Sequence, residues 1–143
     1  ADTTPRTYAQ RKAWVESHHD PYAVFVTTVP ATDAATEGGE RIIGFSALSV
    51  FYDRAGYDGV TDLAYYIAPE WQGRGAGTFT LARLLDECRN RHMRKACGII
   101  FADNRGSIAL MKHFGFTQFG LMPQAATDST GTMRDMSYWH LDL

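Results

Sequence analysis

The sequence predicts an α/β fold built on a mixed sheet. Two strand-like segments form a hairpin pattern in the first part of the chain, and helix and strand patterns alternate after it. A length of 143 residues suits one domain with its own core. The chain shows no internal repeat, linker or change of composition, so we expect a single domain over residues 1–143.

The first elements follow from local patterns. Apolar side chains among polar ones at residues 5–18 predict a short helix. β-Branched and aromatic residues predict strands at 22–29 and 41–51, the second with a bulge or a close backbone approach at Gly44. The polar, glycine-containing stretch 30–40 predicts a mobile hairpin loop between them.

The second half of the chain alternates more regularly. A third strand is expected at residues 60–68, after a loop with two glycines. Apolar residues at helical spacing from Leu81 to Cys88 predict a helix at 78–94 with one face in the core. The remaining segments are expected as a strand at 95–102, a helix at 104–114 capped by Asn104 or Asp103, a short strand at 116–121, a polar loop at 122–132 and a final strand at 133–141.

Composition limits the classes of function. The net charge of −2 argues against a nucleic-acid surface, and no apolar run is long enough for a membrane span. The first residues lack a signal-peptide pattern, and we expect a cytoplasmic protein. Cys88 and Cys97 are expected as reduced core thiols. The five histidines lack metal-ligand spacing, so no metal is assigned.

The most informative stretch is residues 69–78, which carries Gly73, Gly75 and Gly77 between a strand pattern and a helix pattern. Glycines let a backbone approach a ligand closely, and the free N–H groups of a helix start bind phosphates. Arg74 adds a full positive charge. A P-loop would need Gly-Lys-Ser/Thr, and a dinucleotide loop a different glycine spacing. A glycine-rich turn that binds nothing stays open as the alternative.

Two segments resemble signatures of the GCN5-related N-acetyltransferases. The Gln-x-x-Gly-x-Gly order at residues 72–77 resembles the acetyl-CoA pyrophosphate loop, and residues 104–116 resemble the second signature, an Asn that opens a helix ending in Gly-Phe. The resemblance implies a mostly antiparallel sheet in which the strands before these two helices splay apart around the pantetheine arm. It implies acetyl-CoA as cosubstrate, held by Tyr66, Ile67, Gln72, Gly73, Arg74, Gly75, Ala76, Gly77, Thr78, Asn104 and Ser107. Helix capping by Asn104 and Gly115 is the structural alternative, and both readings can hold together.

Within that family the chain is similar to phosphinothricin and methionine sulfoximine acetyltransferases. Four residues match their substrate positions, and the run 131–139 resembles their C-terminal ending; the four are Phe51, Arg54, Tyr57 and Asp62. Family members begin with a further strand and helix, and the resemblance implies that this segment is missing from the N-terminal side of this sequence. The resemblance also makes a homodimer possible.

The chemistry implied by the resemblance is attack of a primary amine on the acetyl thioester. Asp62 is the expected base, directly or through water, and a solvated strand-end acid is the alternative. A main-chain N–H on the strand 65–67 is the expected donor to the thioester oxygen, with Tyr66 as the catalytic candidate. Family members often place a proton donor where this chain has Met111. Tyr65, Tyr66 and His113 are the candidate substitutes, although a core or surface packing role is the simpler interpretation of each.

The acceptor predicted by this resemblance is a small-molecule amine, most simply an amino acid or an analogue. One alternative is a coenzyme A-binding sensor or partner domain with little catalysis, which Met111 and the short N-terminal side favour. Another is a protein N-acetyltransferase on the same fold, which a broad acidic groove would favour.

Overall fold

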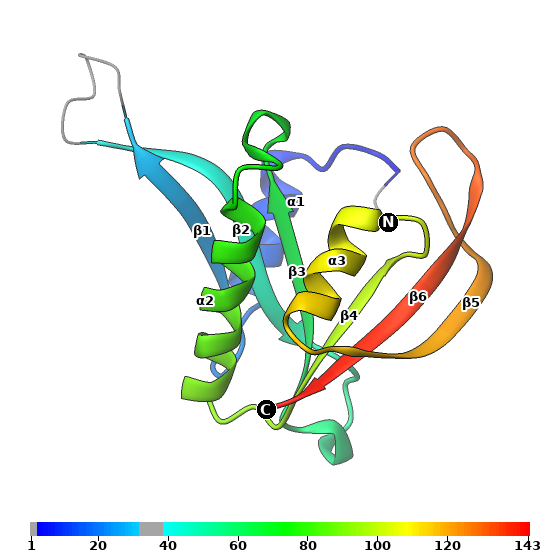
Figure 1. Ribbon diagram of the computed structural model, residues 1–143. Helices are drawn as coiled ribbons and strands as arrows, with labels where there is room; N and C mark the ends of the chain where they lie inside the picture. The colour runs from blue at the N-terminus through cyan, green and yellow to red at the C-terminus, as the bar shows by residue number, and fades with distance from the viewer. Residues whose placement is uncertain (1–2, 32–38) are drawn as a thin grey trace.

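The computed structural model describes residues 3–31 and 39–143, and its sheet has six strands in the order β1-β2-β3-β4-β6-β5. Figure 1 shows this sheet with the helices against it. Most of the hairpin loop predicted at 30–40 lies outside the described residues. In chain order the elements are α1 Tyr8–Glu16, β1 Ala23–Pro30, β2 Glu40–Val50, the 3-10 turn η2 Ala55–Tyr57, β3 Val60–Ile67, the 3-10 turn η3 Pro69–Trp71, α2 Ala76–Asn90, β4 Lys95–Phe101, α3 Arg105–His113, β5 Thr117–Thr127 and β6 Met133–Asp142.

The hairpin of β1 and β2 forms the first antiparallel pair, and β2 then pairs antiparallel with β3. The β1–β2 register shifts between Thr27 and Thr28, opposite Gly44 and Ile42. A Cβ atom at Gly44 would lie 2.4 Å from the carbonyl oxygen of Tyr66 on β3. The expected irregularity and close approach at Gly44 are both confirmed, because only a residue without a side chain fits there.

The strands β3 and β4 form the single parallel contact in the described sheet, and it is short. Their pairing covers only Val60–Asp62 against Lys95–Cys97. The rest of β3 has no partner on that side within the described structure, and Figure 1 shows the two strands diverging toward the upper end of the view. The predicted splayed strand pair and mostly antiparallel mixed sheet are therefore confirmed.

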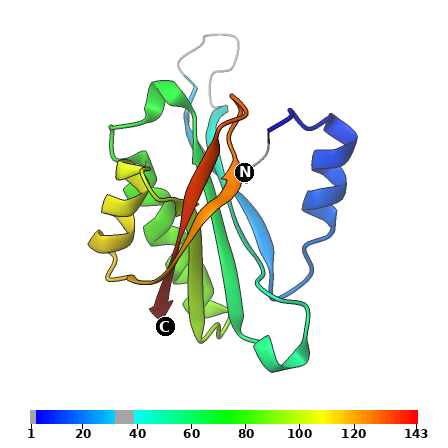
Figure 2. The same cartoon turned by 90° about the vertical axis from the view of Figure 1, so that its right-hand side faces the viewer.

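Helices cover both faces of the sheet. Figure 2 shows α2 and α3 on one side of it and α1 on the other. The main core lies under α2 and α3 and includes Leu48, Leu63, Leu81, Leu84 and Met111, all buried. Because side chains alternate along a strand, the inward position of Leu63 places Asp62 on the opposite face, the one that α1 covers.

The last hairpin differs from the sequence-based expectation. A short strand at 116–121 and a loop at 122–132 were expected, but β5 runs from Thr117 to Thr127. It is an edge strand with mostly exposed side chains, and its second half contains Pro123 and a positive φ at Gln124, features typical of a loop. The ladder with β6 is irregular between Met122 and Ala126, where the Gln124 N–H donates to the Asp135 carboxylate at 2.9 Å.

Both cysteines are free thiols inside the protein, as expected. Cys88 lies on the buried face of α2, and Cys97 on β4. Of the helices in the described residues, none has the length and apolar character needed to cross a membrane.

Candidate active site

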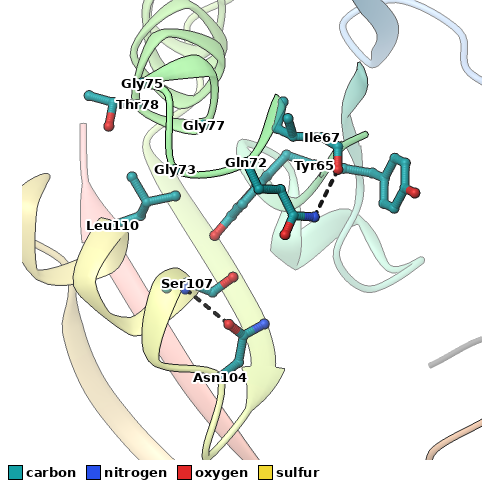
Figure 3. Close-up of a pocket in the computed structure, with 12 residues that line it drawn as sticks. Tyr65, Ile67, Gln72, Gly73, Gly75, Gly77, Thr78, Asn104, Ser107 and Leu110 are labelled. Atoms are coloured by element: carbon teal, nitrogen blue, oxygen red, sulfur yellow. Dashed lines mark hydrogen bonds between the residues drawn. The ribbon is translucent and has the colours of Figure 1, made fainter. Parts of the chain in front are cut away.

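A cavity of about 490 Å³ opens where β3 and β4 separate. It lies between the start of α2 and the start of α3, and Figure 3 shows it in close-up. Its size falls in the range of ordinary small-molecule sites. Twelve residues line it: Tyr65, Tyr66, Ile67, Gln72, Gly73, Gly75, Gly77, Thr78, Asn104, Gly106, Ser107 and Leu110.

The glycine loop gives this cavity an open helix start. Gly73 and Gly75 have φ values of 71° and 87°, a left-handed conformation that other residues adopt with strain. Gly75 is the N-cap of α2, and no described side chain caps this helix or places a carboxylate in its first turn. The first hydrogen bond of the helix runs from the Phe79 N–H to the Gly75 carbonyl, so earlier N–H groups stay available for an anion.

Gln72 connects this loop to the open edge of β3. Its Nε2 donates to the Ile67 carbonyl at 3.0 Å, as Figure 3 shows. Ile67 lies beyond the part of β3 that pairs with β4, so no backbone group of β4 donates to the Ile67 carbonyl. The side chain of Gln72 therefore holds the loop against the strand rather than reaching out for a ligand.

Arg74 does not line the cavity. Its guanidinium lies over the Trp71 ring at 4.1 Å from the ring centre, an arrangement that orients the cation at the rim of the loop. Ala76 is also absent from the cavity lining, although its N–H belongs to the open first turn of α2. The other cofactor residues expected from the sequence are brought together around this one space.

Asn104 combines the two roles considered for it. Its Oδ1 accepts the Ser107 N–H at 3.1 Å and caps α3, which confirms the capping prediction. The amide NH₂ of the same side chain is not used by the cap, and the residue lines the cavity. An Asn amide that caps with its oxygen still has two N–H donors for a ligand.

Tyr65 is a cavity residue that the expected cofactor set missed. Its side chain points to the α2 and α3 face, and Figure 3 shows it directed from β3 toward Ser107. The hydroxyl is buried and has no hydrogen-bond partner among residues 3–31 and 39–143. Burial raises the pKa of Tyr65, and an interaction with the Ser107 hydroxyl offsets part of that rise, although the two groups do not reach the geometry of a hydrogen bond. Strand alternation from Leu63 could have placed Tyr65 here.

Asp62 lies on the other face of the sheet, at the point where the strands part. It pairs in register with Ser49 of β2 and Cys97 of β4. Burial raises the pKa of Asp62 from 3.8 to about 6. A carboxylate with a pKa just below neutrality is ionised at pH 7 yet basic enough to accept a proton.

A second cavity of about 460 Å³ lies on the same face as Asp62. Cys97, the register partner of Asp62, contributes to its lining, whereas Asp62 itself lines neither cavity. Two of the four expected substrate residues, Phe51 and Tyr57, line the second cavity, with ring centres 6.0 Å apart. Arg54 is not among the lining residues, because its guanidinium lies over the exposed ring of Tyr52.

The geometry does not favour Tyr66 as the catalytic donor. Its ring stacks on Phe45, with ring centres 5.7 Å apart, and the side chain is half exposed. The Ala68 N–H donates to the Ile43 carbonyl on β2, so by alternation the Tyr66 N–H also points to β2. The N–H groups of Tyr65 and Ile67 point the opposite way, into the gap, and are the better candidates for the expected main-chain donor.

Comparison with known proteins settles the family. The model of the acetyltransferase (GNAT) family matches residues 2–116, which is most of the chain. The chain belongs to the GNAT family of acetyltransferases. The matched residues include both segments that resemble family signatures, the glycine loop at 72–77 and the segment 104–116.

Relatives of this GNAT chain include enzymes named for small amino-acid analogues. The phosphinothricin N-acetyltransferase of Streptomyces coelicolor is 31% identical over 121 residues, 83% of this chain and 67% of the relative. The L-methionine sulfoximine/L-methionine sulfone acetyltransferase of Pseudomonas aeruginosa is 27% identical over 141 residues, 98% of this chain and 77% of the relative.

Solved structures share the fold of this GNAT chain. A phosphinothricin acetyltransferase from Sinorhizobium meliloti, in complex with acetyl-CoA, superposes with a TM-score of 0.78 at 26% identity, covering 98% of this chain and 71% of that one. A ribosomal-protein-alanine N-acetyltransferase from Brucella melitensis gives 0.83 at 26% identity, covering 98% and 81%. The expected family and fold are thus confirmed, and both kinds of acceptor expected from the sequence occur among structural neighbours.

Proposed function

We propose that this chain transfers the acetyl group of acetyl-CoA to the primary amine of a small molecule, an amino acid or an analogue of one. The observation that carries the proposal is the cavity between β3 and β4, which the glycine loop and the Asn104 helix line together. The two relatives named for phosphinothricin and methionine sulfoximine support the acceptor class.

The residues around the first cavity fit the parts of acetyl-CoA. The uncapped first turn of α2 suits the pyrophosphate, because its N–H groups and the helix dipole favour negative charge. The free amide hydrogens of Asn104 suit the carbonyl groups of the pantetheine arm. The N–H of Tyr65 or Ile67, pointing into the gap, suits the thioester oxygen, where a fixed donor typically lowers the barrier by about 3 kcal/mol.

Asp62 suits the removal of a proton from the incoming ammonium group. It lies beside the gap on the face opposite the first cavity, and its pKa of about 6 matches a base that works near neutral pH. Cys97 is a weak alternative nucleophile, because burial and then the Asp62 charge raise the pKa of its thiol. Direct attack by the amine on the thioester needs no such nucleophile.

The second cavity gives the acceptor site an apolar character. Its aromatic lining comes from Phe51, Tyr57 and Phe119. The two cations at this cavity are already engaged: Arg94 donates to the Asp58 carbonyl at 3.1 Å, and Lys95 pairs with Asp142. An acceptor with an apolar side chain therefore fits this space better than one with two acidic groups.

Two alternative functions are each supported by one observation. The buried Met111, at a position where many family members carry a proton donor, favours a coenzyme A-binding domain with little catalysis. The Brucella melitensis neighbour favours a protein N-terminal acceptor. Association of two chains stays a prediction, which analytical ultracentrifugation would test.

One experiment separates these functions. Calorimetry first measures acetyl-CoA binding, and thiol release is then followed with a panel of apolar and acidic amino acids, their amides, and an alanine-terminated peptide. We expect binding and fastest turnover with apolar amino acids. Binding without turnover of any amine would support the sensor function, turnover of the peptide alone would support the protein acetyltransferase, and no binding would contradict the proposal.

A further inference from the structure

We propose that the Tyr65 hydroxyl gives its proton to the sulfur of coenzyme A as the thioester breaks. This inference deepens the function proposed above and rests on acetyl-CoA occupying the cavity between α2 and α3. It assigns the protonation step to a strand residue rather than to the helix position where family members often carry a donor.

The first support is the unused hydroxyl of Tyr65. It is the sole buried side-chain oxygen or nitrogen that lacks a hydrogen-bond partner within the described residues. A buried hydroxyl without a partner costs folding free energy, so it calls for an explanation. Because Tyr65 lines the same cavity as Asn104 and Ser107, a bound ligand can supply the missing partner.

The second support is the position of Tyr65 along β3. It comes three residues after Asp62, on the part of the strand that has left the parallel ladder. Its side chain faces α2 and α3, whereas Asp62 lies on the opposite face, beside its register partner Cys97, which lines the second cavity. The two groups therefore approach the gap from opposite faces of the sheet, one where the amine would lose its proton and one where the thiol would gain one.

The third support is that other donors considered for this step are badly placed. Met111 is fully buried, and its sulfur lies 3.0 Å from where a Cβ atom of Gly98 would stand, so it is part of the core under β4. Tyr66 stacks on Phe45 on the other face. His113 ends α3 with its ring edge-on to Phe114, and does not line the cavity.

The step balances without any further reactant. The amine nitrogen forms a bond to the acetyl carbon, the carbon–sulfur bond breaks, and the sulfur keeps the bonding electron pair. The nitrogen, which has already given one proton to Asp62, releases its second proton to solvent as the amide forms, the Tyr65 proton moves to the sulfur, and the phenolate recovers a proton from solvent. Burial raises the pKa of Tyr65, so the hydroxyl is fully protonated at neutral pH and ready to donate.

The test compares Tyr65→Phe with Tyr8→Phe, which removes the same hydroxyl from an exposed residue of α1 that lines neither cavity. The ultraviolet absorbance of the thiolate, followed against pH, gives the pKa of the coenzyme A thiol bound to the wild-type protein and to each variant. Since the two variants have equal numbers of tyrosines, tyrosine ionisation provides a matched background. We expect the bound thiol in Tyr65→Phe to titrate at least one pH unit higher than in the wild type, and Tyr8→Phe to match the wild type.

A kinetic comparison with the best amine from the panel completes the test. We expect Tyr65→Phe to lower kcat at least tenfold and to leave the KM for acetyl-CoA within about twofold. A raised KM with unchanged kcat would instead make Tyr65 a coenzyme-positioning residue and overturn the proposal. Equal thiol pKa values in the wild type and Tyr65→Phe would also overturn it.

The acetyltransferase function and the role of Tyr65 can be disproved independently of each other. If the wild type binds coenzyme A but acetylates no amine, that function is wrong, and the thiol titration still decides whether Tyr65 contacts the sulfur. Thermal unfolding of both variants shows whether each is folded; a Tyr65→Phe protein as stable as the wild type keeps the comparison valid, and Tyr65→Leu serves as a second variant if it is not.

Discussion

Asp62 and Cys97 face each other across the last register pair of the parallel ladder between β3 and β4. Beyond them the strands separate, and the cavity between α2 and α3 opens into the gap. The Asp62 carboxylate therefore lies at the point where β3 and β4 stop pairing. Burial at this point, rather than a charged neighbour, accounts for the raised pKa of Asp62.

The first prediction concerns the rate of reaction. Asp62→Asn removes the proposed base and should lower kcat/KM about 10²- to 10⁴-fold near neutral pH. The wild-type rate should fall as pH drops through about 6, where Asp62 takes up a proton. Steady-state rates from pH 5 to 9 test both points, and Asp86→Asn, an exposed exchange on α2, is the control. A rate unchanged by Asp62→Asn at every pH would remove Asp62 from the proton path.

The second prediction concerns stability: the substitution that lowers the rate, Asp62→Asn, should raise the free energy of unfolding. The folded state holds the Asp62 proton up to about pH 6, whereas the unfolded chain loses it near 3.8. Stability from this group is therefore complete below about pH 4 and declines as pH rises to about 6. Asp62→Asn should be more stable than the wild type at pH 8, by up to about 3 kcal/mol, and equal to it near pH 4. Urea unfolding at the two pH values measures this difference, and no gain at pH 8 would contradict the burial of the charge.

The third prediction concerns the glycine loop. Gly75→Glu places a carboxylate at the open start of α2 and should abolish coenzyme A binding, because it competes with the pyrophosphate for the same N–H groups. Gly131→Glu is the matched control, since Gly131 also has a positive φ, at 85°, and open space around it. Calorimetry should show normal affinity for the control. Equal affinity in both variants would show that the loop does not hold the pyrophosphate.

The fourth prediction separates the two roles of Asn104. Asn104→Asp keeps an oxygen that caps α3 but loses the two N–H donors, so thermal stability should stay within about 0.5 kcal/mol of the wild type. Coenzyme A affinity should fall about tenfold or more, because a donor becomes a charged acceptor. Asn104→Ala should lose both the affinity and about 1 kcal/mol of stability. If Asn104→Asp binds coenzyme A normally, the residue is a cap alone.

Local patterns predicted most of the fold, and the reasons differ between elements. The apolar spacing from Leu81 to Cys88 located α2, although its bounds shifted by two to four residues. The edge strand β5 was predicted too short because Pro123, which usually interrupts a strand, lies in its middle. The splay of β3 and β4 was expected only through the family resemblance, since no local pattern encodes where two strands stop pairing.

The candidate site was predicted to a similar degree. The roles of the loop glycines and of Asn104 could be predicted from the sequence, because glycine favours a positive φ and Asn favours the N-cap of a helix. The positions of Tyr65, Tyr66 and Arg74 depend on strand alternation and on a tryptophan ring that only the folded structure brings into contact. A phase error of one residue on β3 exchanges the side chain that faces the coenzyme cavity for one that faces α1.

The two cavities lie on opposite faces of one sheet, near the point where β3 and β4 stop pairing. Neither reactant has to pass through the position of the other, so a ternary complex can assemble in either order, and the acetylated amine can depart while coenzyme A is still held. Kinetics of such a protein should give intersecting rather than parallel reciprocal plots, with no acetyl group ever resident on the polypeptide.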